Sequence, residues 1–303
     1  MMEEVLRVSG EEACPVQGTV KLDPIKCLWN GGMILGAVCL APVYFSWSAL
    51  VLFFATTYVT LLIGHSVGMH RMMIHRTFEC PKALERLLIY IGVLVGIGGP
   101  SAIITIHDTR DWAQRQSQCH DFFSHERSYL RDVTWQLFYR FEFDKAPIVK
   151  IESRLARDSW IRFFDRTWRL HQLVLALILF AIGGLPWVVW GVCFRVAVST
   201  IGHWSITYVC HNPGPGRWHV KNAGVQASNL NFKLAGLLTH GECWHNNHHA
   251  FPESAMIGLE PEQTDPAWVV IRKMQNLGWA TDIKLPRNPL LRSDLLERVS
   301  TKT

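Results

Sequence analysis

Three histidines in one short segment are spaced so that they could bind a metal ion together. The segment, residues 240–252, reads HGECWHNNHHAFP and contains His245, His248 and His249. If the segment is helical, side chains three and four positions apart project from one face. Burying three imidazoles side by side is unfavourable unless each has a partner, and Fe, Zn, Cu and Ni all suit imidazole. The segment therefore predicts a metal site.

Further histidines lie next to the two most apolar stretches of the chain. His70 and His75 follow the first stretch, His211 follows the second, and His107 lies in the more polar region between them. We expect helices from separate parts of the chain to bring these imidazoles to one place. Five other histidines are interpreted as surface or hydrogen-bonding residues: His65, His171, His203, His219 and His240.

The two apolar stretches are each long enough to cross a membrane twice. Residues 27–64 contain no Asp, Glu, Lys, Arg or His, and residues 172–202 contain a single charge, Arg195. Because a bilayer span needs about 20 apolar residues, each stretch predicts a helical hairpin that turns at Pro, Gly or Ser. The predicted spans are about residues 28–45, 47–64, 170–185 and 187–207.

The basic residues lie almost entirely outside the predicted hairpins. No Lys or Arg lies between Lys26 and Arg71, and the positive-inside rule then places both termini and the metal site in the cytoplasm. We expect an all-α, multi-pass integral membrane protein with four spans in two transmembrane helical hairpins. One membrane-embedded domain, residues 1–303, would carry the histidine-rich site on a cytoplasmic helical cap of residues 65–169 and 208–303. The net charge of +5 suits an anionic membrane surface, and the scattered basic residues predict no nucleic-acid partner.

An uncharged segment between the two hairpins, residues 87–106, is also about as long as a span. A single crossing there would place His70 and His107 on opposite sides of the membrane, which a shared site forbids. We therefore expect this segment to re-enter or to lie at the membrane interface. Its glycines also make a straight spanning helix less stable.

The first and last histidine groups resemble sequence motifs of the membrane fatty-acyl (acyl-CoA) desaturases. GMHRMMIHRTF, residues 68–78, is similar to the first histidine box of that family, HxxxxH, and GECWHNNHHAFP is similar to the last box, HxxHH. The order of hairpin, box, polar region, hairpin and box is also similar over about residues 28–285. The resemblance implies a non-haem centre of two iron ions held mainly by histidines. The ligands that it implies outside the second box are His70, His75, His211, His245, His248 and His249.

The second histidine box departs from the family pattern, HRxHH. After a Gly-Pro pair the chain reads HDTRD. His107 matches the first histidine, while Arg110 and Asp111 stand where two more histidines are expected. Asp111 is predicted to be an eighth ligand because carboxylates bind iron, whereas a guanidinium has no lone pair to offer. Thr207 is another departure, since it replaces an Asn that would hold a water on iron.

Another alignment of the second box is also open. It reads QSQCH and would supply Cys119 and His120 in place of HDTRD, with His125 nearby. The alignment through HDTRD is preferred because it keeps the family's spacing from the Pro to the first histidine without a gap.

The resemblance implies an oxidoreductase, namely an O2-dependent fatty-acyl desaturase that introduces a double bond into an acyl chain carried as acyl-CoA or on another acyl carrier. Removing hydrogens from two unactivated methylenes needs an oxidant that no side chain supplies, and iron that activates O2 in an imidazole-rich site supplies it. The expected partners are the fatty-acyl substrate, O2, membrane lipids and a separate electron-transfer protein. An external electron donor is expected because the chain has no haem-binding, ferredoxin or nucleotide motif.

Three alternative functions are open at the level of the sequence. The first is a related hydroxylase of a lipid or hydrocarbon, which would use the same centre and form an alcohol. The second is a non-catalytic membrane protein of the desaturase fold, suggested by the altered second box. The third is a zinc hydrolase with Glu242 as its general base.

Overall fold

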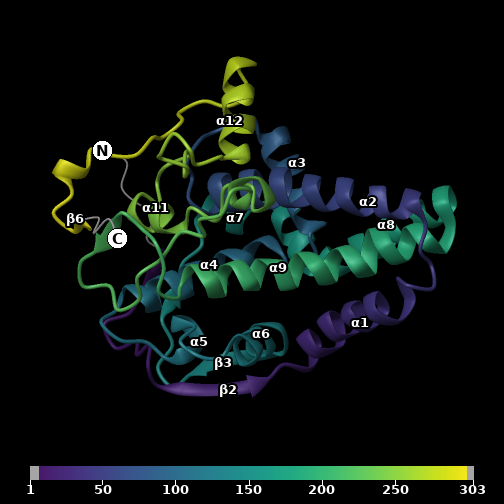
Figure 1. The fold of residues 1–303 in the computed structure, drawn as a ribbon. Helices are drawn as coiled ribbons and strands as arrows, with labels where there is room; N and C mark the ends of the chain where they lie inside the picture. The colour runs from purple at the N-terminus through teal and green to yellow at the C-terminus, as the bar shows by residue number, and fades with distance from the viewer. Residues whose placement is uncertain (1–6, 299–303) are drawn as a thin grey trace.

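Long helices and short elements occupy opposite ends of the molecule (Figure 1). The computed structural model describes residues 7–298. Residues 1–6 and 299–303, which include both of the termini predicted to be cytoplasmic, lie outside the described residues. The long helices run from the right of Figure 1 toward a group of short helices, strands and loops at the left.

The first apolar stretch forms two helices, as its sequence predicts. α1 (Pro24–Leu40) begins at Asp23, whose carboxylate accepts hydrogen bonds from two backbone N–H groups of the first turn. α2 (Trp47–Val59) is capped in the same way by Ser46 and continues directly into a π-helix, η1 (Thr60–Ile74). Together α2 and η1 make one helix of 28 residues, which is long and apolar enough to cross a membrane.

Ser159–Cys210, which contains the second apolar stretch, is also long and apolar enough to cross a membrane. Its helices are α8 (Ser159–Val188), η2 (Val189–Phe194) and α9 (Arg195–Cys210). Gly184 is non-helical, with φ 64° and ψ −160°. The backbone of Gly191 lies against the side chain of Leu179, although a straight helix would separate these residues by about 18 Å. The chain therefore folds back at Gly184, close to the predicted turn.

α1 and α2 pack on η2, which lies between them (Figure 1). Trp190 of η2 makes both contacts. Its Nε1 donates a hydrogen bond to the carbonyl oxygen of Ala41 at 3.2 Å, and its ring centroid lies 6.1 Å from that of Phe53 in α2. The outer faces of the long helices carry large exposed apolar side chains, as contact with lipid requires. These include Leu28, Leu35, Val38, Val51, Phe54 and Leu177.

Residues 87–106 are divided between two helices. α3 (Lys82–Val93) ends before a turn, and α4 (Pro100–Arg115) follows it. Arg195, the single charge in the second apolar stretch, donates to the carbonyl oxygen of Leu94 in this turn and to Oε1 of Gln172, the latter at 2.6 Å. The break rules out one straight helix here, and Arg195 has a structural role in holding the turn. That this segment re-enters the membrane or lies at its interface stays a prediction.

The remaining elements are shorter helices and strands. The short helices are α5 (Asp121–Ser124), α6 (Tyr129–Phe138), α7 (Ser153–Ala156), α10 (Ala235–Leu238), α11 (His245–Ala250), α12 (Pro266–Asn276) and η3 (Pro289–Leu291). The strands are β1 (Val8–Ser9), β2 (Gly18–Leu22), β3 (Tyr139–Phe143), β4 (Ile148–Val149), β5 (Trp218–Val220) and β6 (Leu295–Glu297). They pair antiparallel as β1–β4, β2–β3 and β5–β6. The chain is thus mostly helical, as expected, and three short antiparallel strand pairs join segments that lie far apart in the sequence.

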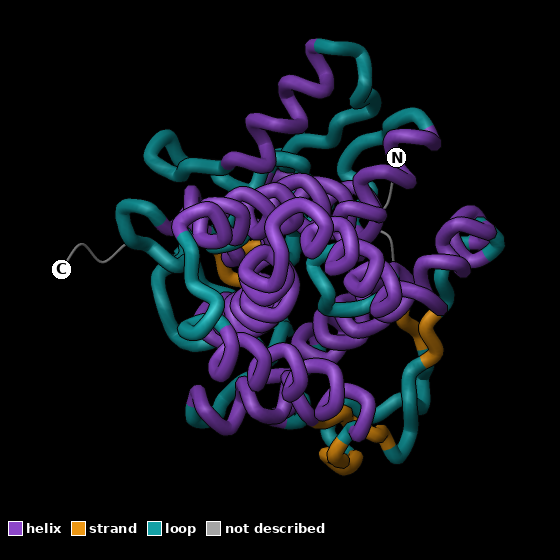
Figure 2. Tube along the Cα trace, turned by 90° about the vertical axis from the view of Figure 1, so that its right-hand side faces the viewer, coloured by secondary structure: helices purple, strands orange, loops and turns teal. Residues whose placement is uncertain are grey.

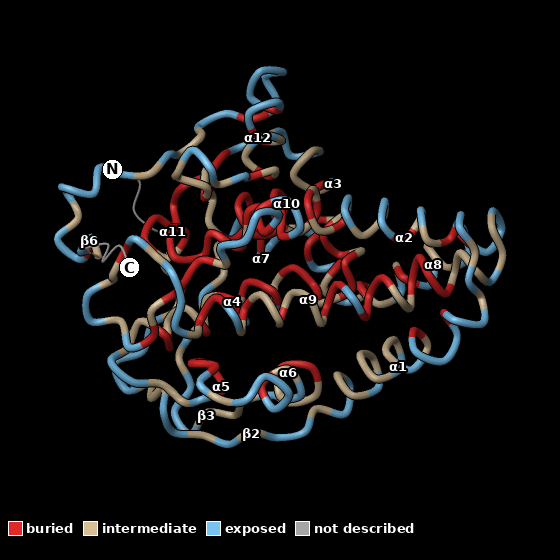
Figure 3. Tube along the Cα trace, viewed as in Figure 1, coloured by how far each residue is buried: buried red, intermediate tan, exposed pale blue. Residues whose placement is uncertain are grey.

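The largest buried core surrounds η1. Buried residues of η1 pack against α3 and α12, and Figure 3 shows the buried backbone concentrated in the middle of the molecule. Figure 2, turned by 90°, shows the helices grouped together with loops around them. η1 and α3 approach closely at Gly64, where a Cβ would lie only 2.3 Å from the backbone nitrogen of Gly92. This core fixes the position of the histidines that η1 carries.

Candidate metal centre

The π-helical form of η1 brings the first histidine box to one side of the helix. His65, His70 and His75 are five residues apart, which in an α-helix would turn successive side chains by about 140°. A π-helix closes i→i+5 hydrogen bonds, so that residues five apart lie near one face. The backbone N–H of His75 donates to the carbonyl oxygen of His70 at 3.0 Å, which is such a bond.

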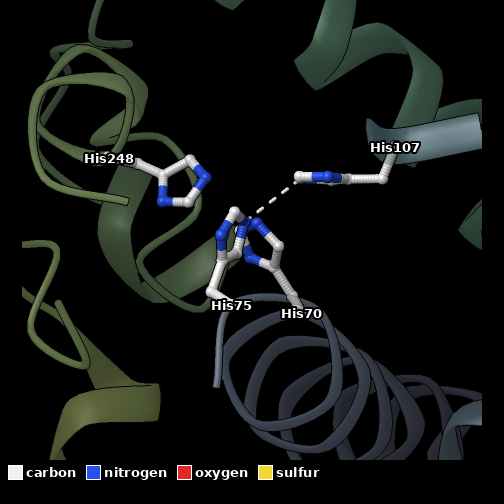
Figure 4. Close-up of side chains that lie close together, drawn as sticks. All are labelled: His70, His75, His107 and His248. Atoms are coloured by element: carbon white, nitrogen blue, oxygen red, sulfur yellow. Dashed lines mark hydrogen bonds between the residues drawn. The ribbon is translucent and has the colours of Figure 1, made fainter. Parts of the chain in front are cut away.

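Four histidines form a first group, which Figure 4 shows with their rings converging. They are His70 in η1, His75 at the end of η1, His107 in α4 and His248 in α11. One nitrogen from each ring lies within 4.8 Å of the corresponding nitrogen of every other ring. The Nε2 atoms of His75 and His107 are 3.3 Å apart. A single metal ion could bind all four imidazoles.

Three histidines form a second group beside the first: His211, His245 and His249. His249 Nε2 lies 3.3 Å from His211 Nε2 and 3.1 Å from His245 Nε2. His211 donates its Nδ1–H to the carbonyl oxygen of Thr207 at 2.7 Å, which leaves its Nε2 lone pair facing the group. The hydroxyl of Thr207, at the position where the family has an Asn, donates to the carbonyl oxygen of His203 at 3.0 Å. α11 therefore supplies both groups, with His245 and His249 turned to one and His248 to the other.

Burial keeps the imidazoles neutral, as metal binding requires. It is the largest cause of a lowered pKa in five of the seven histidines: His75, His211, His245, His248 and His249. Repulsion between neighbouring imidazoles lowers several of these pKa values further. Burial and then the nearby charge of Arg110 lower the pKa of His245 to about 3. At neutral pH these rings therefore offer lone pairs rather than positive charges.

Carboxylates hold the outer nitrogen of two imidazoles in the first group. Glu242 Oε2 lies 2.7 Å from Nδ1 of His70, and Asp108 Oδ1 lies 3.0 Å from Nδ1 of His107. Asp108 in turn accepts a hydrogen bond from Arg7 Nη1 at 2.8 Å. Such partners fix the tautomer and orientation of a metal-binding histidine. Asp108 was not predicted in this role, although its position directly after His107 was a signal.

The zinc hydrolase hypothesis requires a free general base. Glu242 does not suit that role. Besides His70, its carboxylate accepts a hydrogen bond from Ser66 and lies 3.6 Å from Arg71 Nη2. Burial acts to raise the pKa of Glu242, but these neighbours together lower its pKa well below the usual value. The carboxylate is therefore ionised and fully engaged by its neighbours.

The unusual residues of the second box lie beside the groups rather than within them. Asp111 Oδ2 is 3.7 Å from Nδ1 of His107, which belongs to the first group. Arg110 is buried, and the structure places its Nε 3.8 Å from Asp111 Oδ1. The structure thus brings seven of the eight predicted ligands into two groups and places Asp111 next to one of them.

Among residues 7–298, the alternative second box, QSQCH, lies away from both histidine groups. His120 Nδ1 accepts a hydrogen bond from the backbone N–H of Phe122 at 3.0 Å, at the start of α5. Its ring packs 4.7 Å from that of Phe141. His125 lies closer, stacked 5.4 Å from the ring of His211, but its Nδ1 is held by Asp132 at 3.0 Å.

An apolar cavity of about 270 Å³ reaches both histidine groups. His70 and His107 of the first group and His245 of the second line it. Much of the remaining wall is hydrocarbon: Leu61, Ile97, Ile103, Ile106, Val198 and Ile206. A hydrocarbon chain in this cavity would lie directly against the histidine centre.

These features define a helical protein whose histidine-rich cluster opens onto an apolar cavity. The chain belongs to the fatty acid desaturase family, which it matches over residues 45–275. The expected family membership is therefore confirmed, and the protein is an oxidoreductase that acts on fatty acyl chains.

Relatives with assigned activities include enzymes that use two kinds of acyl carrier. The chain is 34% identical over 271 residues to an acyl-CoA C20 Δ5-desaturase of Anemone leveillei, covering 87% of this chain and 82% of that protein. It is 33% identical over 277 residues to an icosanoyl-CoA 5-desaturase of Limnanthes douglasii, covering 85% and 74% of the two chains. It is also 32% identical over 255 residues to an sn-1 stearoyl-lipid 9-desaturase of Synechocystis sp., covering 84% and 77%.

Proposed function

We propose that this protein introduces a double bond into a fatty-acyl chain carried as acyl-CoA, using O2 and two electrons from a separate electron-transfer protein. The observation that carries the proposal is the contact of one apolar cavity with both histidine groups. Similarity to acyl-CoA desaturases supports the choice of carrier. Non-haem iron suits sites of neutral imidazoles with open positions, and when bound it supplies the oxidising power for O2 chemistry.

The proposed centre holds two iron ions. His70, His75, His107 and His248 would hold one ion, and His211, His245 and His249 would hold the other. Asp111 is the proposed eighth ligand. Its buried Oδ1 has no hydrogen-bond partner among the described residues. Burial acts to raise the pKa of Asp111, but His107 and two arginines lower it well below the usual value, so the carboxylate is ionised.

The remaining residues act on the substrate and on the geometry of the centre. The cavity would exclude water and hold the acyl chain, with each buried methylene contributing about 0.8 kcal/mol to binding. Glu242 and Asp108 would keep Nδ1 of His70 and of His107 hydrogen-bonded, so that each ring presents its Nε2 to iron. The bend and depth of the cavity would set which carbons lie against the centre.

We also propose that residues 1–303 form one multi-pass membrane domain with four spans, arranged as two hairpins. The exposed apolar faces of α1, α2 and α8 support this topology. The positions of Lys and Arg support a cytoplasmic cap of residues 65–169 and 208–303, with the centre on that side. Membrane lipids would then surround the long helices.

Product analysis tests the proposal. The purified full-length protein, loaded with Fe(II), is given O2 and palmitoyl-CoA, with reduced ferredoxin or reduced cytochrome b5 in separate reactions. We expect a monounsaturated product that requires both iron and O2. The same assay with palmitoyl phosphatidylcholine asks whether the carrier is a lipid instead. An alcohol would favour the related hydroxylase, and unchanged substrate with both electron donors would contradict the proposal.

A further inference from the structure

Three histidines that belong to neither group also line the cavity: His65 in η1, His203 in α9 and His240 after α10. His65 and His203 form a pair. Their rings meet edge to face, with centroids 4.9 Å apart. His65 lies one π-helical turn before His70, and those two rings are parallel with centroids 6.4 Å apart. The pair therefore lies in the cavity wall next to the first histidine group.

Neither imidazole of this pair has a hydrogen-bond partner in the part of the chain that the structure describes. Nδ1 of His65 is buried and unpaired, and the neighbours of His203 are the rings of His65 and Trp204. Two hydroxyls of the cavity wall, those of Thr57 and Ser199, are buried and unpaired as well. Buried polar groups are almost always hydrogen-bonded, so this part of the cavity is suited to a ligand with a polar group.

A plain hydrocarbon chain offers these imidazoles no partner. Each neutral imidazole has one N–H donor and one nitrogen acceptor. A hydroxyl group has one donor and two acceptor positions, so a single hydroxyl can accept from one ring and donate to the other. From the sequence, both histidines are expected to be ordinary surface or hydrogen-bonding residues, and their joint exposure to the cavity becomes visible only in the fold.

We propose that the natural substrate is an acyl chain that carries a hydroxyl group near the reacting carbons, and that His65 and His203 bind this hydroxyl. The inference rests on the proposed function, because it specifies the class of acyl chain that the same cavity receives. The hydroxyl would fix the position of the chain along the cavity. It would thereby choose which methylenes lie beside the first histidine group.

Equilibrium binding without turnover tests this proposal on the purified full-length protein. The probes are palmitic acid and a series of palmitic acids with one hydroxyl at successive positions, competing against radiolabelled palmitic acid. At one position or a few adjacent positions we expect the hydroxyl to tighten binding about tenfold, the effect of one or two net hydrogen bonds. Equal or weaker binding of every hydroxy acid to the wild type would overturn the proposal, whether or not any variant folds.

Paired variants then assign the preference to the two imidazoles. H65L/H203L should lose the tenfold preference and still bind palmitic acid, whereas H65Q/H203Q, which keeps donors and acceptors, should retain part of it. His171→Leu is the matched control, because His171 is an imidazole of α8 whose Nε2 pairs with Thr167 Oγ1. A preference that survives H65L/H203L, or is lost equally in His171→Leu, would contradict the assignment.

Activity assays separate this inference from the proposed function. Desaturation of palmitoyl-CoA with no hydroxyl preference in binding would refute the hydroxylated substrate and leave the desaturase proposal intact. A hydroxyl preference without any oxidation of the hydroxylated acyl-CoA would support the binding site and refute the desaturase proposal. An alcohol formed from unsubstituted palmitoyl-CoA would assign the site to the hydroxyl of a product, which also overturns the inference.

Discussion

The carboxylate of Glu242 lies 2.7 Å from Nδ1 of His70 and joins the last histidine box to the first. Ser66 donates a hydrogen bond to the same carboxylate, and Arg71 Nη2 lies 3.6 Å from it. Arg71 is itself held by Asp265 through hydrogen bonds of 2.9 and 3.0 Å. A carboxylate in this position keeps the proton on Nδ1 and leaves Nε2 free for a metal.

Replacing this carboxylate should weaken iron binding. In Glu242→Gln the neutral amide no longer stabilises the Nδ1–H of His70, and Arg71 loses a counter-charge. We expect iron affinity or activity to fall about 10- to 100-fold, measured as the iron retained during dialysis against a competing chelator. The control is Glu262→Gln, since Glu262 is exposed. Wild-type iron retention in Glu242→Gln would show that the carboxylate does not support the centre.

Arg7 should stabilise the centre from the N-terminal segment. Its side chain is buried and donates to Asp108, to Glu152 and to the carbonyl oxygen of Ile74, at 2.8, 2.8 and 2.9 Å. Arg7→Met removes the guanidinium from all three acceptors, and we expect a loss of about 3 kcal/mol, which lowers Tm by several degrees.

The matched control for Arg7 is Arg140→Met, an arginine in an exposed pair with Glu142. Exposed pairs add little to stability, so its Tm should stay within a degree or so of the wild type. Differential scanning fluorimetry of both variants in detergent makes the comparison. Equal Tm values for the two variants would mean that the network around Asp108 does not stabilise the fold.

The lowered pKa values of the buried histidines predict how the stability of the metal-free protein depends on pH. Burial lowers the pKa of His245 from 6.5 to about 3. Between these values the unfolded chain binds the proton and the folded chain does not, so the free energy of unfolding decreases as pH falls below about 6.5. Each such histidine contributes a slope of about 1.4 kcal/mol per pH unit.

The measurement is Tm of the metal-free protein at steps from pH 7.5 to pH 5. We expect Tm to fall below pH 6.5, and His245→Leu to make that fall shallower because it removes one titrating group. A constant or rising Tm over this interval would contradict the burial of neutral imidazoles.

Histidine motifs in the sequence predicted which imidazoles lie together, but not how they divide between two groups. The spacing of His245, His248 and His249 indicated one face of a helix and one shared site. In α11 the first and last of these are four positions apart and join one group, while His248 points to the other group. The division depends on where η1, α4 and α9 lie around α11, and those positions are set by long-range packing.

The first histidine box shows a second limit of the sequence. HxxxxH would separate its two rings on an α-helix, and no local signal indicated that residues 60–74 form a π-helix. Partners such as Glu242 and Asp265 were also not predictable, because they reach η1 from distant parts of the chain. Apolar stretches, by contrast, depend on local composition, and they predicted the helices near 28–45 and 47–64 and the reversal at Gly184.

The close approach of η1 and α3 predicts opposite effects of two Gly→Ala substitutions. In Gly64→Ala the new Cβ would lie 2.3 Å from the backbone nitrogen of Gly92, so η1 must shift, at a cost of about 1–3 kcal/mol. Gly32→Ala, in α1, places its Cβ in open space and should stabilise the helix by about 0.5–1 kcal/mol. Tm and iron content of both variants test this, and an unchanged Gly64→Ala protein would contradict the packing that positions the first box.

The metal content of second-box variants distinguishes the two alignments of that box. We expect wild-type protein to bind two iron ions and Asp111→Ala to bind less, because Asp111 is ionised, buried and next to His107. His120→Ala should keep the wild-type iron content, because His120 Nδ1 is occupied by the backbone N–H of Phe122 at the start of α5.

Inductively coupled plasma mass spectrometry on folded, monodisperse samples gives the ratio of iron to protein. His107→Ala is the positive control, since His107 belongs to the four-histidine group and its loss should lower iron content whichever alignment holds. Loss of iron in His120→Ala but not in Asp111→Ala would show that the second box is QSQCH and not HDTRD. That result would require α5 to move toward the centre, because the structure holds His120 against Phe141.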